Sequence, residues 1–181
     1  MLPEKETKRL SKFLSYLLRH HPETLGLVLD ENGWTPVDRL IEALQANHPG
    51  FSREVLQHIV DTNSKKRFAL SEDGSLIRAS QGHSIEVDLG YTSQQPPEIL
   101  YHGTAEKNLA SILENGLQKI SRRHVHLSAN EETAISVGQR HGRPVVLKIQ
   151  AGRMFSNGFT FFLSANHVWL TDTVPATFIV R

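Results

Sequence analysis

The sequence changes character at a short polar stretch near its middle. Residues 90–97 are polar and end in two adjacent prolines. Proline lacks a backbone N–H and favours an extended chain, so tandem prolines interrupt both helices and sheets. We therefore expect an interlobe linker at 91–97, which separates an N-terminal lobe (1–90) from a C-terminal lobe (98–181). A chain of 181 residues is long enough for two small lobes.

The N-terminal lobe has a helical pattern. One apolar stripe is formed by Leu10, Phe13, Leu14, Leu17 and Leu18. Because Pro22 disfavours helix at the residue before it, this helix should end near His20 or His21. We expect a second helix with Thr35 as its N-cap and a third with Ser52 as its N-cap.

A β-hairpin is predicted to follow these helices. Residues 67–71 and 75–79 have strand composition, and Asp73-Gly74 between them favours a tight turn. Three helices followed by a hairpin outline a winged-helix-like lobe, which often binds nucleic acid. The fold by itself does not establish that function.

The C-terminal lobe alternates short strands with helices. Strands are predicted at 99–102, 124–127, 145–149, 168–170 and 177–180. Helices are predicted at 106–115, closed by Gly116, and at 131–137. The whole chain is therefore predicted to be α+β.

Composition narrows the class of protein. Cysteine is absent, which excludes disulfides and zinc–thiolate sites. The N-terminus lacks a signal-peptide pattern and no apolar run could span a bilayer, so we expect a cytoplasmic protein without a membrane partner. The net charge is only +1, with −2 before residue 91 and +3 after it. Any nucleic acid should be bound by a few placed cations rather than by a broad positive face.

Four segments combine cationic or polar groups with apolar ones: 17–22, 65–68, 101–104 and 137–142. Arginine suits phosphate because its planar fork donates two parallel hydrogen bonds, and histidine can move a proton near neutrality. Taken singly, each segment also has a plain structural explanation. Arg19 would favour the dipole of a helix C-terminus, and Arg140 could simply belong to a helix end.

The sequence gives weaker support to a metal site. His124 and His126 have ligand spacing on one strand face, and His102, His141 and Asp172 are further candidates. The chain shows no His-Glu-x-x-His signature, so we expect no metal.

The series of motifs resembles the RNA 2′-phosphotransferases. The resemblance is carried by Leu-Leu-Arg-His-x-Pro, Lys-Lys-Arg-Phe, Tyr-His-Gly-Thr and Arg-His-Gly, in that order, and by Gly33-Trp34, Gln81-Gly82-His83-Ser84, Val125-His126-Leu127-Ser128 and Val168-Trp169-Leu170-Thr171. It extends from about residue 10 to the end. It implies a winged-helix-like RNA lobe followed by an ADP-ribosyltransferase-like lobe.

The resemblance also implies site residues. The RNA 2′-phosphate would be surrounded by the catalytic residues Arg19, His20, Arg67 and Arg140. The NAD⁺ pocket would be formed by His102, Gly103, Thr104, Gly116, His126, Ser128 and Val168. Val168 would stand where many ADP-ribosyltransferases have a glutamate. Lys65 is a further electrostatic candidate.

The implied reaction consumes NAD⁺ and needs no metal. It releases nicotinamide and ADP-ribose 1″,2″-cyclic phosphate through an RNA-2′-phospho-ADP-ribose intermediate, as in tRNA splicing in fungi. The partners would be RNA carrying a 2′-phosphate and NAD⁺, and we expect a monomer. The alternative is an ADP-ribosyltransferase that modifies a terminal phosphate or a protein and stops after one step. An RNA-binding module without catalysis and a metal-dependent phosphatase are further alternatives.

Overall fold

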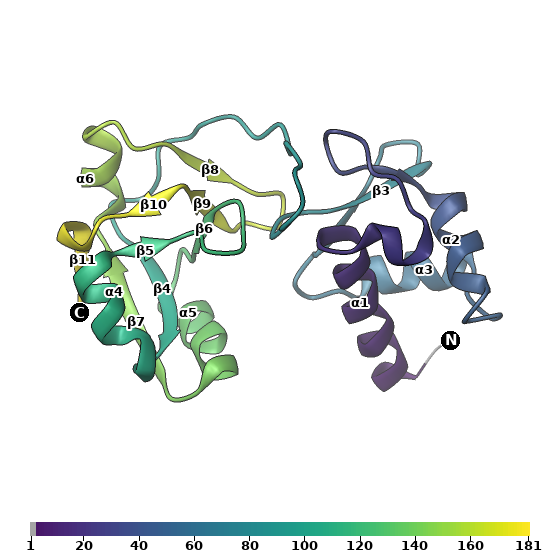
Figure 1. Cartoon of the computed structure of the whole chain (residues 1–181), viewed down its shortest axis with the longest axis horizontal. Helices are drawn as coiled ribbons and strands as arrows, with labels where there is room; N and C mark the ends of the chain where they lie inside the picture. Colours follow the sequence, from purple (N-terminus) through teal and green to yellow (C-terminus); the bar gives the residue numbers. More distant parts are fainter. Residues whose placement is uncertain (1–2) are drawn as a thin grey trace. The chain divides into compact units, whose positions relative to one another are not determined.

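Two separate apolar cores form in the computed structural model, which describes residues 3–181. They belong to two compact units, unit 1 at Met1–Gly90 and unit 2 at Tyr91–Arg181. Both units contain helices and antiparallel strands (Figure 1), which confirms the predicted α+β class. The winged-helix-like and ADP-ribosyltransferase-like architectures stay predictions. Within residues 3–181, no helix is long and apolar enough to cross a bilayer.

Unit 1 consists of helices with a small sheet. Its elements are α1 (Glu4–Arg19), the 3-10 turn η1 (Pro22–Leu25), β1 (Thr35–Pro36), α2 (Val37–Gln45), α3 (Arg53–Asp61), β2 (Phe68–Leu70) and β3 (Leu76–Ala79). The apolar stripe of α1 is buried in the core, and the helix ends as Pro22 requires, with His20 as its C-cap. Ser52 caps α3 as predicted, because its Oγ accepts a hydrogen bond from the Val55 amide.

The predicted hairpin is confirmed, but the start of α2 was predicted wrongly. Strands β2 and β3 pair antiparallel, and β1 completes the sheet in the order β1-β3-β2. Thr35 is not the N-cap of α2: it lies in β1 opposite Ile77, and Pro36 occupies the cap position without a side-chain cap bond. Sheet pairing has replaced the local capping interaction that the sequence favours.

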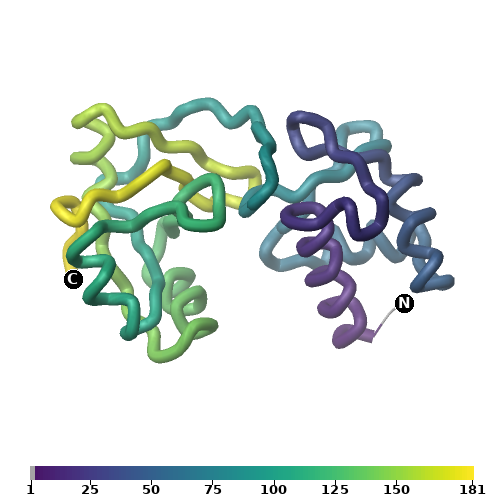
Figure 2. The backbone as a smooth tube through the Cα atoms, viewed as in Figure 1, coloured from purple at the N-terminus to yellow at the C-terminus, as the bar shows by residue number. Residues whose placement is uncertain are grey.

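Unit 2 contains three small sheets and several short helices. Its elements are β4 (Leu100–Ala105), η2 (Glu106–Asn108), α4 (Leu109–Asn115), β5 (Leu117–Gln118), β6 (Val125–Leu127), α5 (Glu131–Gly138), η3 (Gln139–His141), β7 (Pro144–Ile149), α6 (Ala151–Ser156), β8 (Phe161–Leu163), β9 (Trp169–Thr171), β10 (Thr173–Val174), η4 (Ala176–Phe178) and β11 (Ile179–Val180). The sheets have the orders β11-β7-β4, β6-β9-β8 and β10-β5. Figure 2 traces this unit from teal β4 to the yellow C-terminal segment.

Most predicted strands of unit 2 are present, with one partial error. The expected strand at 177–180 is a strand only over β11, because the preceding residues form the 3-10 turn η4. That turn is closed by a hydrogen bond from the Phe178 amide to the Pro175 carbonyl. Residues 91–97, expected as a linker, include Ser93, which is bridged to Phe162 of β8, and buried Pro96.

Strand β4 packs very closely against helix α5. A Cβ atom built on Gly103 of β4 would lie 1.7 Å from the Ala134 carbonyl oxygen of α5. A Cβ on Gly138, at the end of α5, would lie 2.8 Å from the Thr104 carbonyl oxygen. Figure 1 shows α5 beside β4. Both glycines are therefore required for this packing, which positions the segment 102–104.

Candidate functional site

The end of α1 presents the first two candidate residues. Arg19 is the last residue of the helix, and Nε and Nη2 of its guanidinium are buried. The Nδ1 atom of His20 lies 2.8 Å from the Ser84 hydroxyl. The Ser84 amide donates to the Arg19 carbonyl at 3.0 Å. These bonds hold the His20 ring and the end of the helix to residues 80–84.

The side chain of Asn63 organises the loop that carries Arg67. Its Oδ1 accepts hydrogen bonds from the amides of Lys65 (3.1 Å) and Arg67 (3.4 Å). Its Nδ2 donates to the hydroxyl of buried Ser11 on α1 at 2.7 Å. Lys66 adopts a φ of +40°, which lies in the left-handed region that non-glycine residues rarely enter. The loop is therefore anchored to α1 immediately before β2 begins.

Residues 80–84 connect the two parts of the candidate site in unit 1. The Ser80 amide donates to the Arg67 carbonyl at 2.8 Å, and its hydroxyl donates to the Lys66 carbonyl. The same segment reaches Arg19 and His20 through Ser84. The structure thus brings Arg19, His20 and Arg67 to one short segment, although they are far apart in the sequence. The Gln-Gly-His-Ser motif supplies much of this connection.

In unit 2, β4 meets β6 at the NAD⁺-pocket candidates. Tyr101 and Ser128 exchange two backbone hydrogen bonds of 2.8 Å each. The Nδ1 atom of His102 donates to the His126 carbonyl at 3.1 Å. Strand β6 pairs with β9, where Val168 immediately precedes the first strand residue. His102, His126, Ser128 and Val168 therefore lie on or beside adjoining strands.

The remaining two NAD⁺-pocket candidates, Thr104 and Gly116, both make local structural contacts. Thr104 is buried, and its hydroxyl accepts a hydrogen bond from Asn108 Nδ2 at 3.3 Å. Gly116 closes α4 with a φ of +75°, and a Cβ there would lie 2.2 Å from the Val174 carbonyl oxygen. Glycine is required at this position by the backbone itself.

Arg122 is a candidate that the sequence analysis missed. Its Nη1 donates to His126 Nδ1 at 3.2 Å. Desolvation by neighbouring protein atoms lowers the pKa of Arg122, and the like charge of Arg140 lowers this pKa further. Arg122 is therefore close enough to Arg140 for their charges to interact. Its position four residues before His126, beside the His-Val-His-Leu-Ser segment, was the available signal.

The surroundings of His102 favour its neutral form. Burial is the largest effect and lowers the pKa of His102, and the positive charge of Arg122 acts in the same direction. The hydrogen bond to the His126 carbonyl raises the pKa of His102 but does not outweigh burial. With Nδ1 as the donor, Nε2 of the neutral ring is an acceptor. The local excess of cations favours an anionic ligand.

The histidines weighed as metal ligands have other neighbours. His124 packs edge-on against the ring of Phe162, with 5.7 Å between the ring centroids. His126 contacts Arg122, a cation, which opposes binding of a metal ion. Among residues 3–181, no three His, Asp or Glu side chains are grouped as a metal site would require.

Comparison with known proteins identifies the family. A model of the RNA 2′-phosphotransferase, Tpt1 / KptA family matches residues 5–173. A "probable RNA 2′-phosphotransferase" of Acaryochloris marina is 51% identical over 178 residues, which cover 98% of each chain. Relatives with the same description from Flavobacterium johnsoniae and Pectobacterium carotovorum are 52% identical (97% of each chain) and 53% identical (94% of this chain and 92% of the relative).

The chain belongs to the RNA 2′-phosphotransferase family. The resemblance stated from the sequence motifs is thereby confirmed. Membership in the RNA 2′-phosphotransferase family supports an enzyme that removes a 2′-phosphate from RNA. The family match spans both groups of candidate residues, from Arg19 in unit 1 to Val168 in unit 2.

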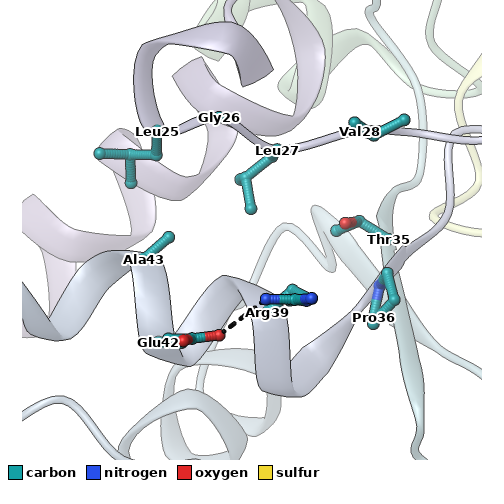
Figure 3. Close-up of a pocket in the computed structure, with 9 residues that line it drawn as sticks. All are labelled: Leu25, Gly26, Leu27, Val28, Thr35, Pro36, Arg39, Glu42 and Ala43. Carbon is teal, nitrogen blue, oxygen red and sulfur yellow. Dashed lines mark hydrogen bonds and ion pairs between the residues drawn. The ribbon is translucent and has the colours of Figure 1, made fainter.

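A pocket of about 480 Å³ in unit 1 is lined by none of these candidate residues. Figure 3 shows its lining, which is Leu25, Gly26, Leu27, Val28, Thr35, Pro36, Arg39, Glu42 and Ala43. Arg39 and Glu42 form an ion pair of 3.2 Å at its side. The only charged residues of this lining, Arg39 and Glu42, already pair with each other, so we assign no role in phosphate binding to the pocket.

Proposed function

We propose that this RNA 2′-phosphotransferase transfers an internal RNA 2′-phosphate to NAD⁺ in two steps. The observation that carries the proposal is the convergence of basic and imidazole groups within each unit. In unit 1, Arg19, His20 and Arg67 are joined through residues 80–84. In unit 2, cationic Arg122 and its neighbour Arg140 adjoin the strand segment around His102. Both groups offer cations suited to phosphate, and the second also lies beside the strand segment proposed to hold NAD⁺.

The arginines supply the positive charge that phosphoryl transfer requires. A 2′-phosphate carries up to two negative charges, and arginine binds it through parallel N–H donors that stay protonated at any accessible pH. We assign Arg19, Arg67 and Arg140 to this role, and we add Arg122 because of its proximity to Arg140. Fixed cations also stabilise charge that develops in the transition state. The scheme therefore needs no metal ion.

The backbone of Gly103 is suited to the nicotinamide carboxamide of NAD⁺. In an antiparallel strand, successive residues direct their amide and carbonyl to opposite sides. Tyr101 directs its amide and carbonyl away from β7, toward Ser128, which follows β6. Gly103 lies two residues further along β4, so its amide and carbonyl point to the same side as those of Tyr101. A carboxamide can donate to that carbonyl and accept from that amide.

In the first step, an oxygen of the RNA 2′-phosphate attacks C1″ of NAD⁺, and nicotinamide leaves. This forms RNA-2′-phospho-ADP-ribose. The phosphate is already an anion, so no base is needed to activate it. Val168, at the position where many ADP-ribosyltransferases have a glutamate, is consistent with a nucleophile that needs no deprotonation. Its half-buried apolar side chain has no ionisable group.

In the second step, the ribose 2″-hydroxyl attacks the phosphorus and expels the RNA 2′-oxygen. The products are RNA with a 2′-hydroxyl and ADP-ribose 1″,2″-cyclic phosphate. The proton of the 2″-hydroxyl must leave, and the expelled oxygen must gain one. We assign this proton transfer to His20, whose ring is oriented by Ser84 at 2.8 Å.

The test uses a short RNA with one internal 2′-phosphate, incubated with and without NAD⁺ in the presence of a chelator. Phosphate loss that requires NAD⁺ and is unaffected by the chelator is the expected result. His20→Ala should accumulate the ADP-ribosylated RNA, because only the second step needs proton transfer. A wild-type reaction that stops at ADP-ribosylated RNA would instead support a one-step ADP-ribosyltransferase. Phosphate loss without NAD⁺ would refute the transfer.

Two adjacent arginines provide a matched control. Arg122→Ala should lower kcat/KM by roughly 100-fold, the scale on which removal of one oxyanion-stabilising donor acts. Arg123→Ala removes the same charge one residue away, from a side chain for which we propose no part in binding, and should change kcat/KM little. Equal losses in both variants would show that only the general positive charge matters, and would remove Arg122 from the site.

A further inference from the structure

The outward face of α1 carries a line of cations that leads to Arg19. Lys5, Lys12 and Arg19 are spaced seven residues apart, so they lie on one side of the helix at intervals of about two turns, roughly 10 Å each. Lys5 and Lys12 are both exposed. The acidic residues nearby do not neutralise them, because Glu4 pairs with Lys8 at 2.6 Å and Glu6 with Arg9 at 3.9 Å.

An exposed aromatic ring lies on the same face. Tyr16 follows Lys12 by four residues and precedes Arg19 by three, so it is the neighbour of both. Tyr16 is 44% exposed, and it is not part of the apolar core of unit 1. The ring of His21 lies against it at a centroid distance of 4.7 Å and an interplanar angle of 30°.

The His21 ring is itself held in place. Its Nδ1 atom lies 2.9 Å from a carboxylate oxygen of Glu23 in η1. Tyr16 is therefore supported on one side by an anchored ring, while much of its own ring surface stays open to solvent. The exposed part of the Tyr16 ring offers a surface on which a nucleic-acid base can stack.

We propose that this face of α1, formed by Lys5, Lys12, Tyr16 and His21, binds the RNA segment that flanks the 2′-phosphate. A base of the flanking segment stacks on the Tyr16 ring, and its backbone phosphates contact Lys12 and then Lys5. The inference rests on the proposed function only in that it takes Arg19 and His20 as the site of the 2′-phosphate. Cations in a line with an aromatic ring among them are the features that bind single-stranded nucleic acid without sequence preference.

The experiment measures Kd by fluorescence anisotropy in the absence of NAD⁺. Two RNAs are compared: a dinucleotide with a 2′-phosphate, and an oligonucleotide of about ten residues around the same 2′-phosphate, a length within the usual site size for single strands. Tyr16→Ala should weaken binding of the longer RNA by roughly 5- to 100-fold, the cost of losing one stacked base, and leave the dinucleotide unchanged. Tyr16→Phe keeps the ring and should bind both RNAs as the wild type does.

Lysine variants test the phosphate contacts. Lys12→Ala should reduce the slope of log Kd against log salt concentration by about 0.7 for the longer RNA, the value for one phosphate contact with a single strand. Lys107→Ala removes another exposed cation, from η2 in unit 2, and should leave the slope unchanged.

Several outcomes would overturn the inference. One is an equal effect of Tyr16→Ala on both RNAs, which would indicate a structural role at the end of α1. Another is an unchanged Kd in both Tyr16→Ala and Lys12→Ala. A third is a wild-type protein that binds the longer RNA no more tightly than the dinucleotide, in which case the face belongs to another class of partner. Because the binding assay contains no NAD⁺, failure of the proposed reaction would not by itself change these results.

Discussion

The contact between β4 and α5 allows the effect of one methyl group to be estimated. In Gly103→Ala, the new Cβ would lie 1.7 Å from the Ala134 carbonyl oxygen and 2.5 Å from its carbonyl carbon. A carbon and an oxygen in contact are normally about 3.3 Å apart, so β4 and α5 would have to separate by about 1.6 Å. The neighbouring atoms belong to the backbone, and no rotamer change can relieve the overlap.

The free energy of unfolding should fall accordingly. Overpacking of a filled interior costs about 1–3 kcal/mol, and we expect the upper end, about 3 kcal/mol, because a helix must move. For a chain of this size the melting temperature should drop by roughly 6–12 °C. The displaced segment also carries His102, so the proposed binding of NAD⁺ should weaken in the same variant.

Thermal melting followed by circular dichroism, together with calorimetric titration of NAD⁺, measures both effects. Gly50→Ala is the matched control, because a Cβ there meets no atom within 4 Å and its φ is not in the left-handed region. A Gly103→Ala protein that melts within about 2 °C of the wild type, less than 1 kcal/mol on this scale, would refute the packing argument.

Two further predictions follow from other contacts. Burial lowers the pKa of His102 below the unfolded value of about 6.5, so the stability that comes from its neutral form should be lost as the pH falls through that value. In urea titrations, His102→Asn should therefore lose less stability than the wild type between about pH 7.5 and pH 5.5. Equal losses would contradict a lowered pKa of His102. Asn63→Ala removes a side chain that bonds to Ser11 and to two loop amides. The free energy of unfolding, measured by urea titration, should fall by about 2 kcal/mol, and binding of 2′-phosphorylated RNA should weaken. Asn47→Ala, on the surface, should change neither. Normal RNA binding by Asn63→Ala would show that the loop keeps its conformation without this anchor.

Local sequence rules accounted for several element boundaries. Pro22 marks the end of α1, and Ser52 caps α3, because each acts on the backbone within one turn. The same rules failed at Thr35, where pairing with Ile77 across the sheet decided the conformation. The short elements α6, β5, β8 and β10 were not predicted, since a few residues hold too little periodicity to indicate a strand or helix.

The residues of the candidate site were likewise predicted only in part from the sequence. The motif series indicated Arg19, His20 and Arg67, and it indicated the segment 102–104, because their residue types suit phosphate and nucleotide chemistry. Arg122 was missed because its position four residues before His126 does not by itself distinguish it from the adjacent Arg123. Only the fold separates the two, by directing Arg122 to His126 and toward the charge of Arg140.

The family, the α+β class and the chemical character of the site could be predicted from the sequence, since they depend on residue types and on spacing along the chain. Which of those residues contact one another depends on the folded chain. Asn63 joins its loop to α1, residues 80–84 join Arg67 to His20, and Gly103 lets β4 approach α5. Each of these contacts links residues that are distant in the sequence. A local sequence pattern does not specify such partners, because the hydrogen bonds and the close backbone packing form only when the chain folds.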